Sequence, residues 1–368
     1  MLDAKIVFIP SVSGGLGHVT RTLRLAQELE HRRPALRLEY VLDQDRLRES
    51  NLPFVKSTGY PVRVLPSRTR YTRDIVVRAL LGDADLIVED TTPYLIPYRQ
   101  LLKAAWVSVE MFPLEDELFM NWPMLRQSDC VLWTYPAALG LPKELEMLGD
   151  KVRVTGPILG SRELPSREQG RRLLGFRDDE RIITYSPRAM PFGRDFGERL
   201  LSGLVNGFIA LRQQRPELRL ILTGVCDRSE LRFPDMPPLE QLDQAEGIDV
   251  RGVLSPKEIR ALLAGADIVV AEGTTTTFEA IAAATPVLMV PGPIYETWLI
   301  GTRLYEADAI EIEWIEQVTP TTMRSHLDKI LNDSSRTQER LRRAREFLGP
   351  EGTHQAADEI LRILDARR

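Results

Sequence analysis

Cysteine and histidine are scarce in this sequence of 368 residues, which has two cysteines and four histidines. Cys130 and Cys226 stand far apart in the chain, so neither a cysteine zinc cluster nor a disulfide framework is expected. No apolar run approaches the roughly 18 residues that a membrane-spanning helix requires. The net charge of −5 argues against a general nucleic-acid-binding protein. These features together favour a protein of the reducing cytoplasm.

The chain is long enough for two globular domains of roughly 150 residues each. Short runs of valine, isoleucine and leucine alternate with longer helical patterns along most of its length. The runs lack period-two alternation, which is typical of parallel strands covered by helices on both faces. We therefore predict an α/β fold with doubly wound sheets. The predicted strands are Ile6–Ile9, Leu38–Leu42, Leu86–Val88, Trp106–Val109, Ile182–Tyr185, Leu218–Leu222, Ile268–Val270 and Val287–Val290.

The first candidate site is a glycine-rich loop that follows the strand Ile6–Ile9 and opens a helix. Gly14, Gly15 and Gly17 allow backbone amides to approach a ligand, and the start of a helix favours an anion. His18 stands at the junction, where its imidazole can accept a proton from a hydroxyl group or water. The structural alternative is a histidine that is hydrogen-bonded to the backbone at the helix start. The other histidines are expected on the surface: His31, His326 and His354.

The second candidate site is a strand end followed by glycine, four threonines and a helix of small residues. Free amides and hydroxyl groups at such a helix start can bind a diphosphate without a metal ion. Glu279, one turn into the helix, can accept hydrogen bonds from a ribose diol. The alternative is a capping box between Thr276 and Glu279. The diphosphate-binding residues are predicted to be Gly273, Thr274, Thr275, Thr276 and Thr277.

Three further patterns are less specific. Ser186 and Arg188 follow a predicted strand, where the arginine can neutralise a phosphate or be a solvated loop residue. Asp83 and Asp85 match a metal-binding pair only superficially and are interpreted as a turn, so no metal site is predicted. A basic stretch either contacts an anionic acceptor or a lipid surface, or is a solvated helix face. It contains Arg63, Arg68, Arg70, Arg73 and Arg78.

The two principal motifs together resemble those of the GT-B superfamily of glycosyltransferases. Gly14–Arg21 is similar to the G-x-G-H-x-x-R loop of one branch of that superfamily. This branch contains peptidoglycan N-acetylglucosaminyltransferase, diacylglycerol glycosyltransferases and nucleotide-sugar hydrolases. Val154–Pro157 resembles the turn that leads into the second domain, and Asp267–Pro291 resembles the donor-nucleotide motif. The resemblance follows the whole chain in order.

This resemblance implies two Rossmann-like domains that face each other across a cleft. Residues 1–157 would form the acceptor-side domain and 158–340 the nucleotide-sugar-binding domain, with helices from 341–368 packing back on the first. The implied reaction is metal-independent, inverting transfer of a sugar from a nucleotide diphosphate sugar, here a UDP-sugar, to a hydroxyl acceptor. His18 would serve as base or ligand contact, and Glu110 would lie on the acceptor side. No cofactor and no nucleic-acid partner are implied; the acceptor is a small molecule or lipid-linked, and weak contact with a membrane surface stays open.

The chain departs from the family pattern after Pro293, where the family has residues that contact the donor sugar. Glu296 and Thr297 can still bind a sugar, but the usual asparagine is absent. A nucleotide-sugar hydrolase with water as the acceptor therefore stays open, as does a non-catalytic nucleotide- or glycan-binding protein. An epimerase fits less well because it needs more acids and bases than one histidine supplies, although Glu110, Glu115 and Asp116 keep it open.

Overall fold

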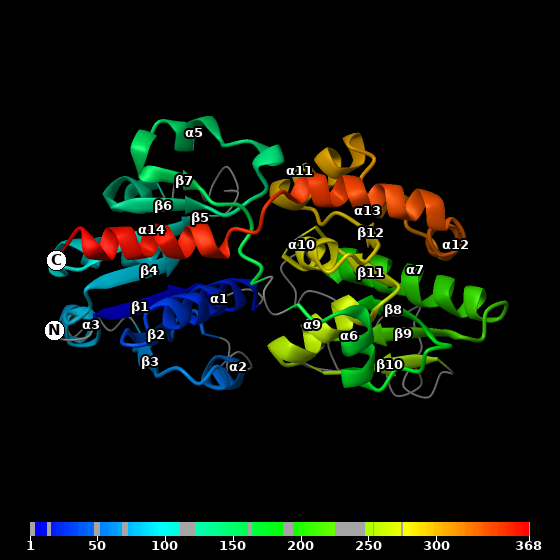
Figure 1. Ribbon diagram of the computed structural model, residues 1–368, viewed down its shortest axis with the longest axis horizontal. Helices are drawn as coiled ribbons and strands as arrows, with labels where there is room; N and C mark the ends of the chain where they lie inside the picture. Colours follow the sequence, from blue (N-terminus) through cyan, green and yellow to red (C-terminus); the bar gives the residue numbers. More distant parts are fainter. Residues whose placement is uncertain are drawn as a thin grey trace. The chain divides into compact units, whose positions relative to one another are not determined.

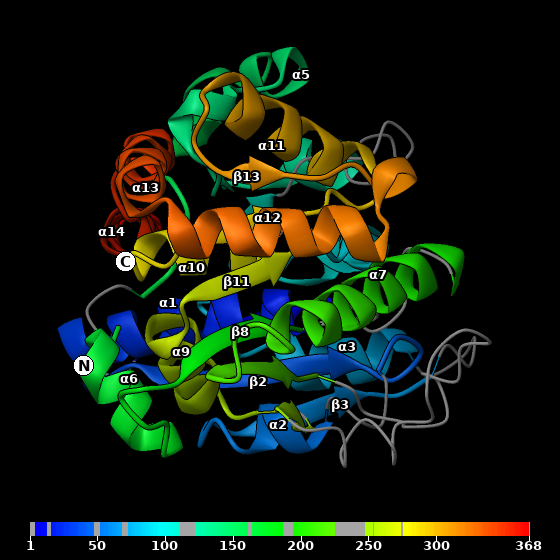
Figure 2. The ribbon, with the colours of Figure 1, turned by 90° about the vertical axis from the view of Figure 1, so that its right-hand side faces the viewer.

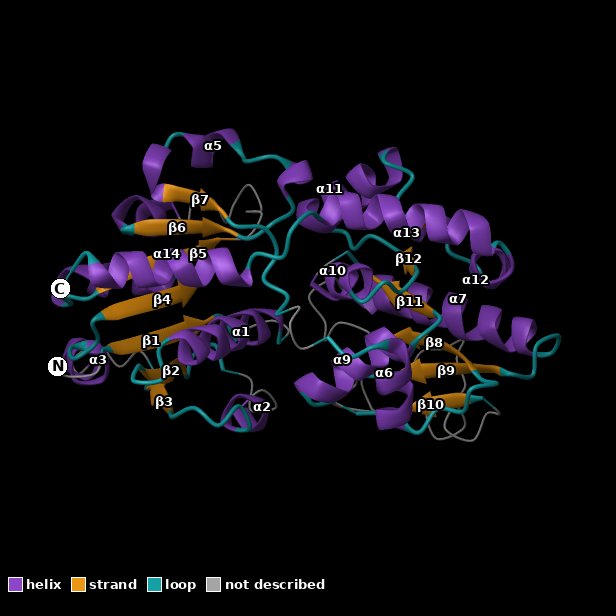
Figure 3. Cartoon of the chain, viewed as in Figure 1, coloured by secondary structure: helices purple, strands orange, loops and turns teal. Residues whose placement is uncertain are grey.

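The chain forms two compact units in this computed structural model, one comprising Met1–Gly160 with Gly349–Arg368 and the other Ser161–Leu348 (Figure 1). The structure describes residues 4–12, 16–47, 52–67, 73–110, 122–160, 164–186, 194–224, 247–252, 254–273 and 275–367. Each unit contains one parallel sheet with helices on both faces, drawn by secondary structure in Figure 3. The predicted α/β fold with two doubly wound, Rossmann-like sheets is confirmed.

The first unit is built on a seven-stranded parallel sheet in the order β3-β2-β1-β4-β5-β6-β7. Its strands are β1 (Lys5–Pro10), β2 (Arg37–Asp43), β3 (Val62–Leu65), β4 (Leu86–Asp90), β5 (Ala105–Glu110), β6 (Cys130–Trp133) and β7 (Val152–Val154). Its α-helices are α1 (Gly17–Arg32), α2 (Leu52–Lys56), α3 (Arg73–Leu81), α5 (Lys143–Glu146) and α14 (Thr353–Asp365). Short 3₁₀ helices are η2 (Pro93–Leu101), η3 (Ala137–Leu139) and η4 (Gly149–Lys151).

Both faces of this sheet are buried, which explains the continuous apolar runs of its strands. In β1, Ile6 and Phe8 belong to one core cluster, whereas Val7 and Ile9 belong to the cluster on the opposite face. Successive side chains of a strand point to opposite faces, so a strand covered on both sides has to be apolar throughout. Helices α1 and α14 cover one face, and α3 and η2 contribute to the core on the other.

The C-terminal helix α14 belongs to the first unit although it follows the second in sequence (Figure 1). Its apolar residues pack into the same cluster as α1, and Arg33 forms two hydrogen bonds with Asp365. The returning chain is joined to the end of the first segment by a hydrogen bond from Gly352 N to Pro157 O at 2.8 Å. Gly156 has a φ of 82°, and a Cβ there would lie 2.8 Å from Pro350 O, so glycine is required.

The units divide at positions that differ from the sequence-based limits of 157 and 340. The first division lies after Gly160, whose amide is bonded to Glu351 and Thr353 of the returning segment. The second lies after Leu348, because helix α13 (Ser334–Leu348) remains within the second unit. Residues 341–348 therefore do not join the first unit with α14.

The second unit contains a six-stranded parallel sheet in the order β10-β9-β8-β11-β12-β13. Its strands are β8 (Arg181–Tyr185), β9 (Leu218–Leu222), β10 (Ile248–Val250), β11 (Ile268–Ala271), β12 (Val287–Met289) and β13 (Glu311–Ile312). Its other helices are α6 (Arg167–Leu174), α7 (Arg194–Arg212), α9 (Pro256–Gly265), α10 (Thr275–Ala282), α11 (Tyr295–Glu306), η7 (Ile315–Gln317) and α12 (Pro320–Asn332). Figure 2 shows α7 and α12 side by side; their apolar residues form one core cluster with β8 and β9.

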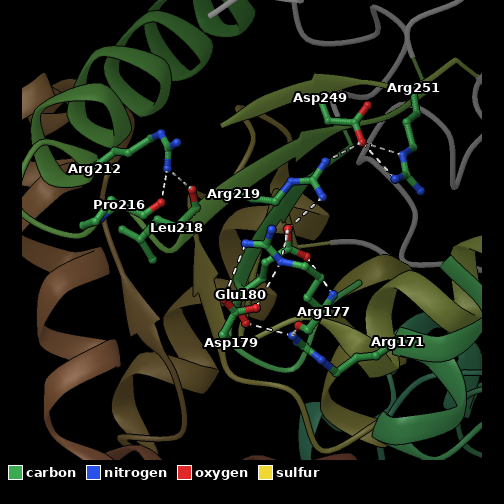
Figure 4. Close-up of polar contacts among 10 residues, drawn as sticks. All are labelled: Arg171, Arg177, Asp179, Glu180, Arg212, Pro216, Leu218, Arg219, Asp249 and Arg251. Atoms are coloured by element: carbon green, nitrogen blue, oxygen red, sulfur yellow. Dashed lines mark hydrogen bonds and ion pairs between the residues drawn. The ribbon is translucent and has the colours of Figure 1, made fainter. Parts of the chain in front are cut away.

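A network of charged side chains occupies the amino end of this second sheet (Figure 4). Arg219 Nη1 lies 3.2 Å from Glu180 Oε1, and Arg219 Nη2 lies 3.4 Å from Asp249 Oδ2. Nearby, the buried Asp267 carboxylate accepts hydrogen bonds from the Arg167 and Arg181 side chains and from a strand amide. These contacts attach α6 and the strand starts to one another. Asp267, the first residue of the donor-nucleotide motif, therefore has a structural role at the end opposite to the candidate site.

Candidate functional site

In each sheet, the first strands along the chain are added toward one edge and the later strands toward the other, so the strand order reverses at one point. In the first sheet this switch lies between β1 and β4, and in the second it lies between β8 and β11. Ligands of open α/β sheets bind outside the carboxyl ends of the strands at such a point. The residues that follow these four strands are therefore the candidate site residues.

At the switch of the first unit, His18, Arg21 and Asp90 form a cluster. His18 Nδ1 lies 2.7 Å from Asp90 Oδ1. Arg21 binds the same carboxylate in bidentate fashion, from Nε to Oδ2 at 2.8 Å and from Nη2 to Oδ1 at 2.5 Å. His18 and Arg21 come from the first turns of α1, while Asp90 ends β4, 72 residues later than His18. The glycine loop and the strand end thus converge on one carboxylate.

The charge state of Asp90 decides the tautomer of His18. Complete burial by itself raises the pKa of this carboxyl group, but Arg21 and His18 outweigh it and lower the pKa to about 2. An ionised carboxylate only accepts hydrogen bonds, so His18 donates from Nδ1. Arg21 Nη2 is also 3.3 Å from His18 Nδ1, but two donors cannot bond to each other, and Arg21 is bonded to Asp90 instead. The remaining nitrogen, Nε2, is then free to accept a proton.

The backbone after Asp90 adopts an unusual conformation. Thr91 has a φ of 57°, which is a strained value for a β-branched residue. The turn is held by Glu89, whose Oε2 accepts hydrogen bonds from Thr92 N and Thr92 Oγ1, both at 2.9 Å. Strain of this kind is found at functional sites, where the surrounding structure maintains it. Here it follows the residue that orients His18.

The remaining residues predicted on the acceptor side are placed only in part. Gly17 is the first residue of α1. Gly14 and Gly15 lie outside the described residues, as do Glu115 and Asp116. Glu110 is the last residue of β5, and its side chain is outside the described part of the structure.

Sequence reasoning did not select Asp90, although two signals were available. It ends an apolar strand run, and the segment around it resembles the segment that contains Glu272 and Gly273. Arg21, at the end of the glycine-loop motif, was likewise not assigned a role. A buried aspartate and a buried arginine gain significance only when the fold brings them to the same histidine.

At the switch of the second unit, the chain leaves β11 through Glu272 and Gly273. Tyr185, the last residue of β8, donates a hydrogen bond from its hydroxyl group to Glu272 Oε1 at 2.6 Å. Gly273 has a φ of 91°, and a Cβ at this position would lie 2.1 Å from Met289 Cε and 3.3 Å from Thr297 O. Glycine is therefore required where the chain turns into α10.

The threonines of the second motif form the first turn of α10. Thr275 and Thr276 are half-buried, whereas Thr277 is fully buried and its Oγ1 has no hydrogen-bond partner among the residues that the structure describes. Because Thr276 lies within the helix, it is not the N-cap residue that the alternative capping box requires. Glu279 lies in the second turn and is 6% exposed. The helix start thus presents amides and hydroxyl groups, which are suitable for an anion.

Other residues predicted to contact the donor differ in their surroundings. Ser186 is half-buried directly after β8. Thr297 is buried, and its hydroxyl group lies 2.6 Å from Gly292 O and 2.9 Å from Ile294 O, so its proton is used to hold the start of α11. Glu296 is also buried in this first turn. Thr274 and Arg188 lie outside the described residues.

Three other features noted in the sequence take part in local polar contacts. The turn at Asp83 and Asp85 is confirmed, since the chain turns there between α3 and β4. Lys5 donates to both carboxylates, from Nζ to Asp83 and from its backbone amide to Asp85. The surface position expected for His326 is wrong: the side chain lies between the buried carboxylates of Glu311 and Glu313, at 2.9 and 3.0 Å. His354 is also half-buried, 2.7 Å from Glu28. In the basic stretch, Arg63 pairs with Glu39 rather than standing free, while Arg68 and Arg70 are outside the described residues.

The described residues contain neither a metal-binding cluster nor a membrane-spanning helix. No group of three or more histidine, cysteine, aspartate or glutamate side chains is placed to bind a metal ion in these ranges. Likewise, none of the helices described has both the length and the apolar character needed to span a bilayer.

The chain is similar in structure to several enzymes of the GT-B fold. It matches a protein of Listeria monocytogenes assigned as a UDP-N-acetylglucosamine 2-epimerase with a TM-score of 0.70 and 13% identity, over 100% of this chain and 97% of the other. The calicheamicin glycosyltransferase CalG4 matches with a TM-score of 0.60 and 19% identity, over 100% and 99%. MurG of Acinetobacter baumannii matches with a TM-score of 0.61 and 15% identity, over 98% and 99%. No protein-family model and no curated protein sequence matches the chain.

Proposed function

We propose that this chain, which has the GT-B fold, transfers a sugar from a nucleotide diphosphate sugar to a hydroxyl acceptor, with His18 as the general base. The observation that carries the proposal is the bond between His18 Nδ1 and the ionised Asp90 at the switch point of the first unit. This bond leaves Nε2 as the proton-accepting atom. A histidine oriented by a buried carboxylate is a general arrangement for removing a proton from a hydroxyl group.

The proposed acceptor step uses this arrangement of His18 and Asp90. His18 Nε2 removes the proton as the acceptor oxygen forms a bond to the anomeric carbon of the donor sugar. Asp90 stabilises the imidazolium that results, and Arg21 keeps Asp90 ionised throughout. The bond from the anomeric carbon to the diphosphate breaks as the new bond forms. A single displacement of this kind inverts the anomeric centre.

The leaving group is assigned to the start of α10 in the second unit. The amides and hydroxyl groups of Gly273–Thr277 would bind the diphosphate, and the positive end of the helix dipole would stabilise the charge that develops on it. The hydroxyl group of Thr277, for which the described residues offer no hydrogen-bond partner, supports a ligand here. Glu279 is proposed to bind the ribose diol. This arrangement supplies electrostatic stabilisation from backbone groups, so the proposed transfer requires no metal ion.

The choice of a uridine nucleotide is supported by a structural neighbour, the Listeria monocytogenes protein assigned as an epimerase of UDP-N-acetylglucosamine. The class of reaction is supported by CalG4, which is a glycosyltransferase. We therefore propose a UDP-sugar as the donor.

The test is release of UDP from UDP-sugars by the wild type, His18→Ala and the control His31→Ala. His31 lies at the exposed end of α1, so its loss should leave the rate unchanged. Loss of the His18 base should lower kcat by about 10²- to 10⁴-fold while UDP affinity stays within about twofold. Full activity of His18→Ala would refute the proposal. Release that needs no added hydroxyl acceptor would identify a hydrolase, in which the same base activates water.

A 2-epimerase is the second candidate, because the listerial neighbour superimposes with a TM-score of 0.70 over the whole chain. Such a reaction exchanges the hydrogen at C2 of the sugar. Incubation of UDP-N-acetylglucosamine in heavy water therefore distinguishes the two: deuterium at C2 without net UDP release supports epimerisation. Net UDP release with no deuterium at C2 supports transfer or hydrolysis.

A further inference from the structure

Thr91 follows Asp90 directly and has a backbone conformation that is unfavourable for its residue type. Its φ of 57° lies in the left-handed region that favours glycine, and its branched Cβ adds to the strain. In the described structure, the other non-glycine residues with a positive φ are Ala284 and Asp308, neither of which has a branched Cβ. Glycine would adopt this conformation at position 91 without strain, so the contacts of the threonine have to offset an energetic cost.

The hydroxyl group of Thr91 makes such a contact with the carboxylate that orients His18. Thr91 Oγ1 lies 3.2 Å from Asp90 Oδ1, and it is the donor because an ionised carboxylate only accepts hydrogen bonds. The same oxygen accepts from His18 Nδ1 at 2.7 Å and from Arg21 Nη2 at 2.5 Å. Thr91 therefore belongs to the His18 cluster, although it stands in neither of the two segments that form the proposed site.

The strained turn is also held from the strand that precedes it. Glu89 is 2% exposed, and its Oε2 accepts hydrogen bonds from both the amide and the hydroxyl group of Thr92. Successive side chains of a strand point to opposite faces, so Glu89 and Asp90 leave the end of β4 on opposite sides of the sheet. The chain after β4 is thus bonded to one carboxylate through Thr91 and to the other through Thr92.

We infer that Thr91 is a positioning residue for the transfer reaction, because its strained backbone brings its hydroxyl group to Asp90 Oδ1 and so fixes the carboxylate that orients His18. The inference rests on the proposed function, which makes His18 the base. It implies that stability and activity oppose each other at this position. Glycine should relieve the strain and yet slow the reaction.

The rate of UDP release and the midpoint of urea unfolding test this role in the wild type, Thr91→Gly and Thr91→Ser. Glycine removes both the strain and the hydroxyl group, whereas serine keeps the hydroxyl group without the branched Cβ. We expect Thr91→Gly to lower kcat about tenfold, as for a lost hydrogen bond to a charged group, with an unfolding midpoint no lower than that of the wild type. Thr91→Ser should keep kcat within about threefold of the wild type.

Full activity of Thr91→Gly, or an equal loss of activity in Thr91→Ser, would overturn the inference. A lower unfolding midpoint of Thr91→Gly would overturn it as well, since the strain argument requires the opposite sign.

Ala284→Gly is the matched control for relief of backbone strain. Ala284 has a φ of 58°, nearly equal to that of Thr91, and lies between α10 and β12 in the second unit. This substitution relaxes the backbone in the same way but removes no hydroxyl group from the His18 cluster. We expect kcat to stay unchanged, and a fall as large as that of Thr91→Gly would overturn the inference.

Nitrogen-15 NMR of the histidine side chains tests the same contact without any substrate. The His18 resonances are identified by their absence from His18→Ala. They should shift in Thr91→Gly and stay close to the wild-type values in Thr91→Ser. Unchanged His18 resonances in Thr91→Gly would overturn the inference. If the wild type releases no UDP but these resonances respond as expected, the proposed function is refuted while the positioning of His18 by Thr91 is supported.

Discussion

Replacement of Asp90 by asparagine tests the cluster of the first unit through its effect on stability. The carboxyl pKa is lowered from 3.8 to about 2 in the folded protein. Because one pKa unit is worth about 1.4 kcal/mol, the ionised form of Asp90 contributes about 2 kcal/mol to the free energy of unfolding at neutral pH. A carboxyl group whose pKa is lower in the folded than in the unfolded protein stabilises the fold at pH values above its pKa in the unfolded state. This stability is lost as the pH falls through the pKa of the folded state. We therefore expect Asp90→Asn to cost about 2 kcal/mol at pH 7, with the difference shrinking between about pH 4 and pH 2.

Urea unfolding of the wild type and Asp90→Asn at a series of pH values measures this difference. The control is Asp179→Asn, because Asp179 is 73% exposed in its pair with Arg177 and such surface pairs contribute little. The asparagine can also donate to His18 Nδ1 and so select the wrong tautomer, which should lower kcat by about 10²- to 10⁴-fold. A stability difference that stays constant from pH 7 to pH 2.5 would refute the assignment of Asp90 as the ionised partner.

Three other outcomes follow from the second unit. Gly273→Ala should weaken UDP binding more than tenfold and cost about 1–3 kcal/mol of stability, since a Cβ would lie 2.1 Å from Met289 Cε. Gly59→Ala is the control for backbone strain, because Gly59 has a φ of 85° but open space around it. Equal losses of stability in the two variants would contradict the steric argument. Thr277→Val removes a buried hydroxyl group that has no partner in the described structure, so thermal unfolding should show no loss of stability. Calorimetry should show weaker UDP binding by this variant, and unchanged affinity would exclude the hydroxyl group from the diphosphate site. Dialysis against EDTA should leave the rate of UDP release unchanged, and a loss that Mg²⁺ restores would contradict metal-independent transfer.

The elements predicted from sequence are those whose signal is local. Apolar runs such as Ile6–Ile9 and Leu218–Leu222 coincide with β1 and β9 because a strand covered on both faces has to be apolar throughout. The missed strands have two to four residues, and several carry mixed patterns, although β6 (Cys130–Trp133) is apolar and buried throughout. For example, β3 alternates valine with Arg63 and is mostly half-buried, while β13 has only two residues. Their strand conformation depends on pairing with a neighbour that lies far away in sequence.

The fold class, the glycine loop with His18 and a helix that begins near Thr275–Thr277 were predictable from the chain, because each depends on residues that are adjacent in it. Which side chains meet depends instead on how the strands are arranged in space. His18 and Asp90 are 72 residues apart, and Tyr185 and Glu272 are 87 apart. Parallel strands bring their carboxyl ends to one edge of a sheet, but the order of the strands decides which ends are neighbours. That order depends on the packing of the whole unit, so no local pattern could identify either pair.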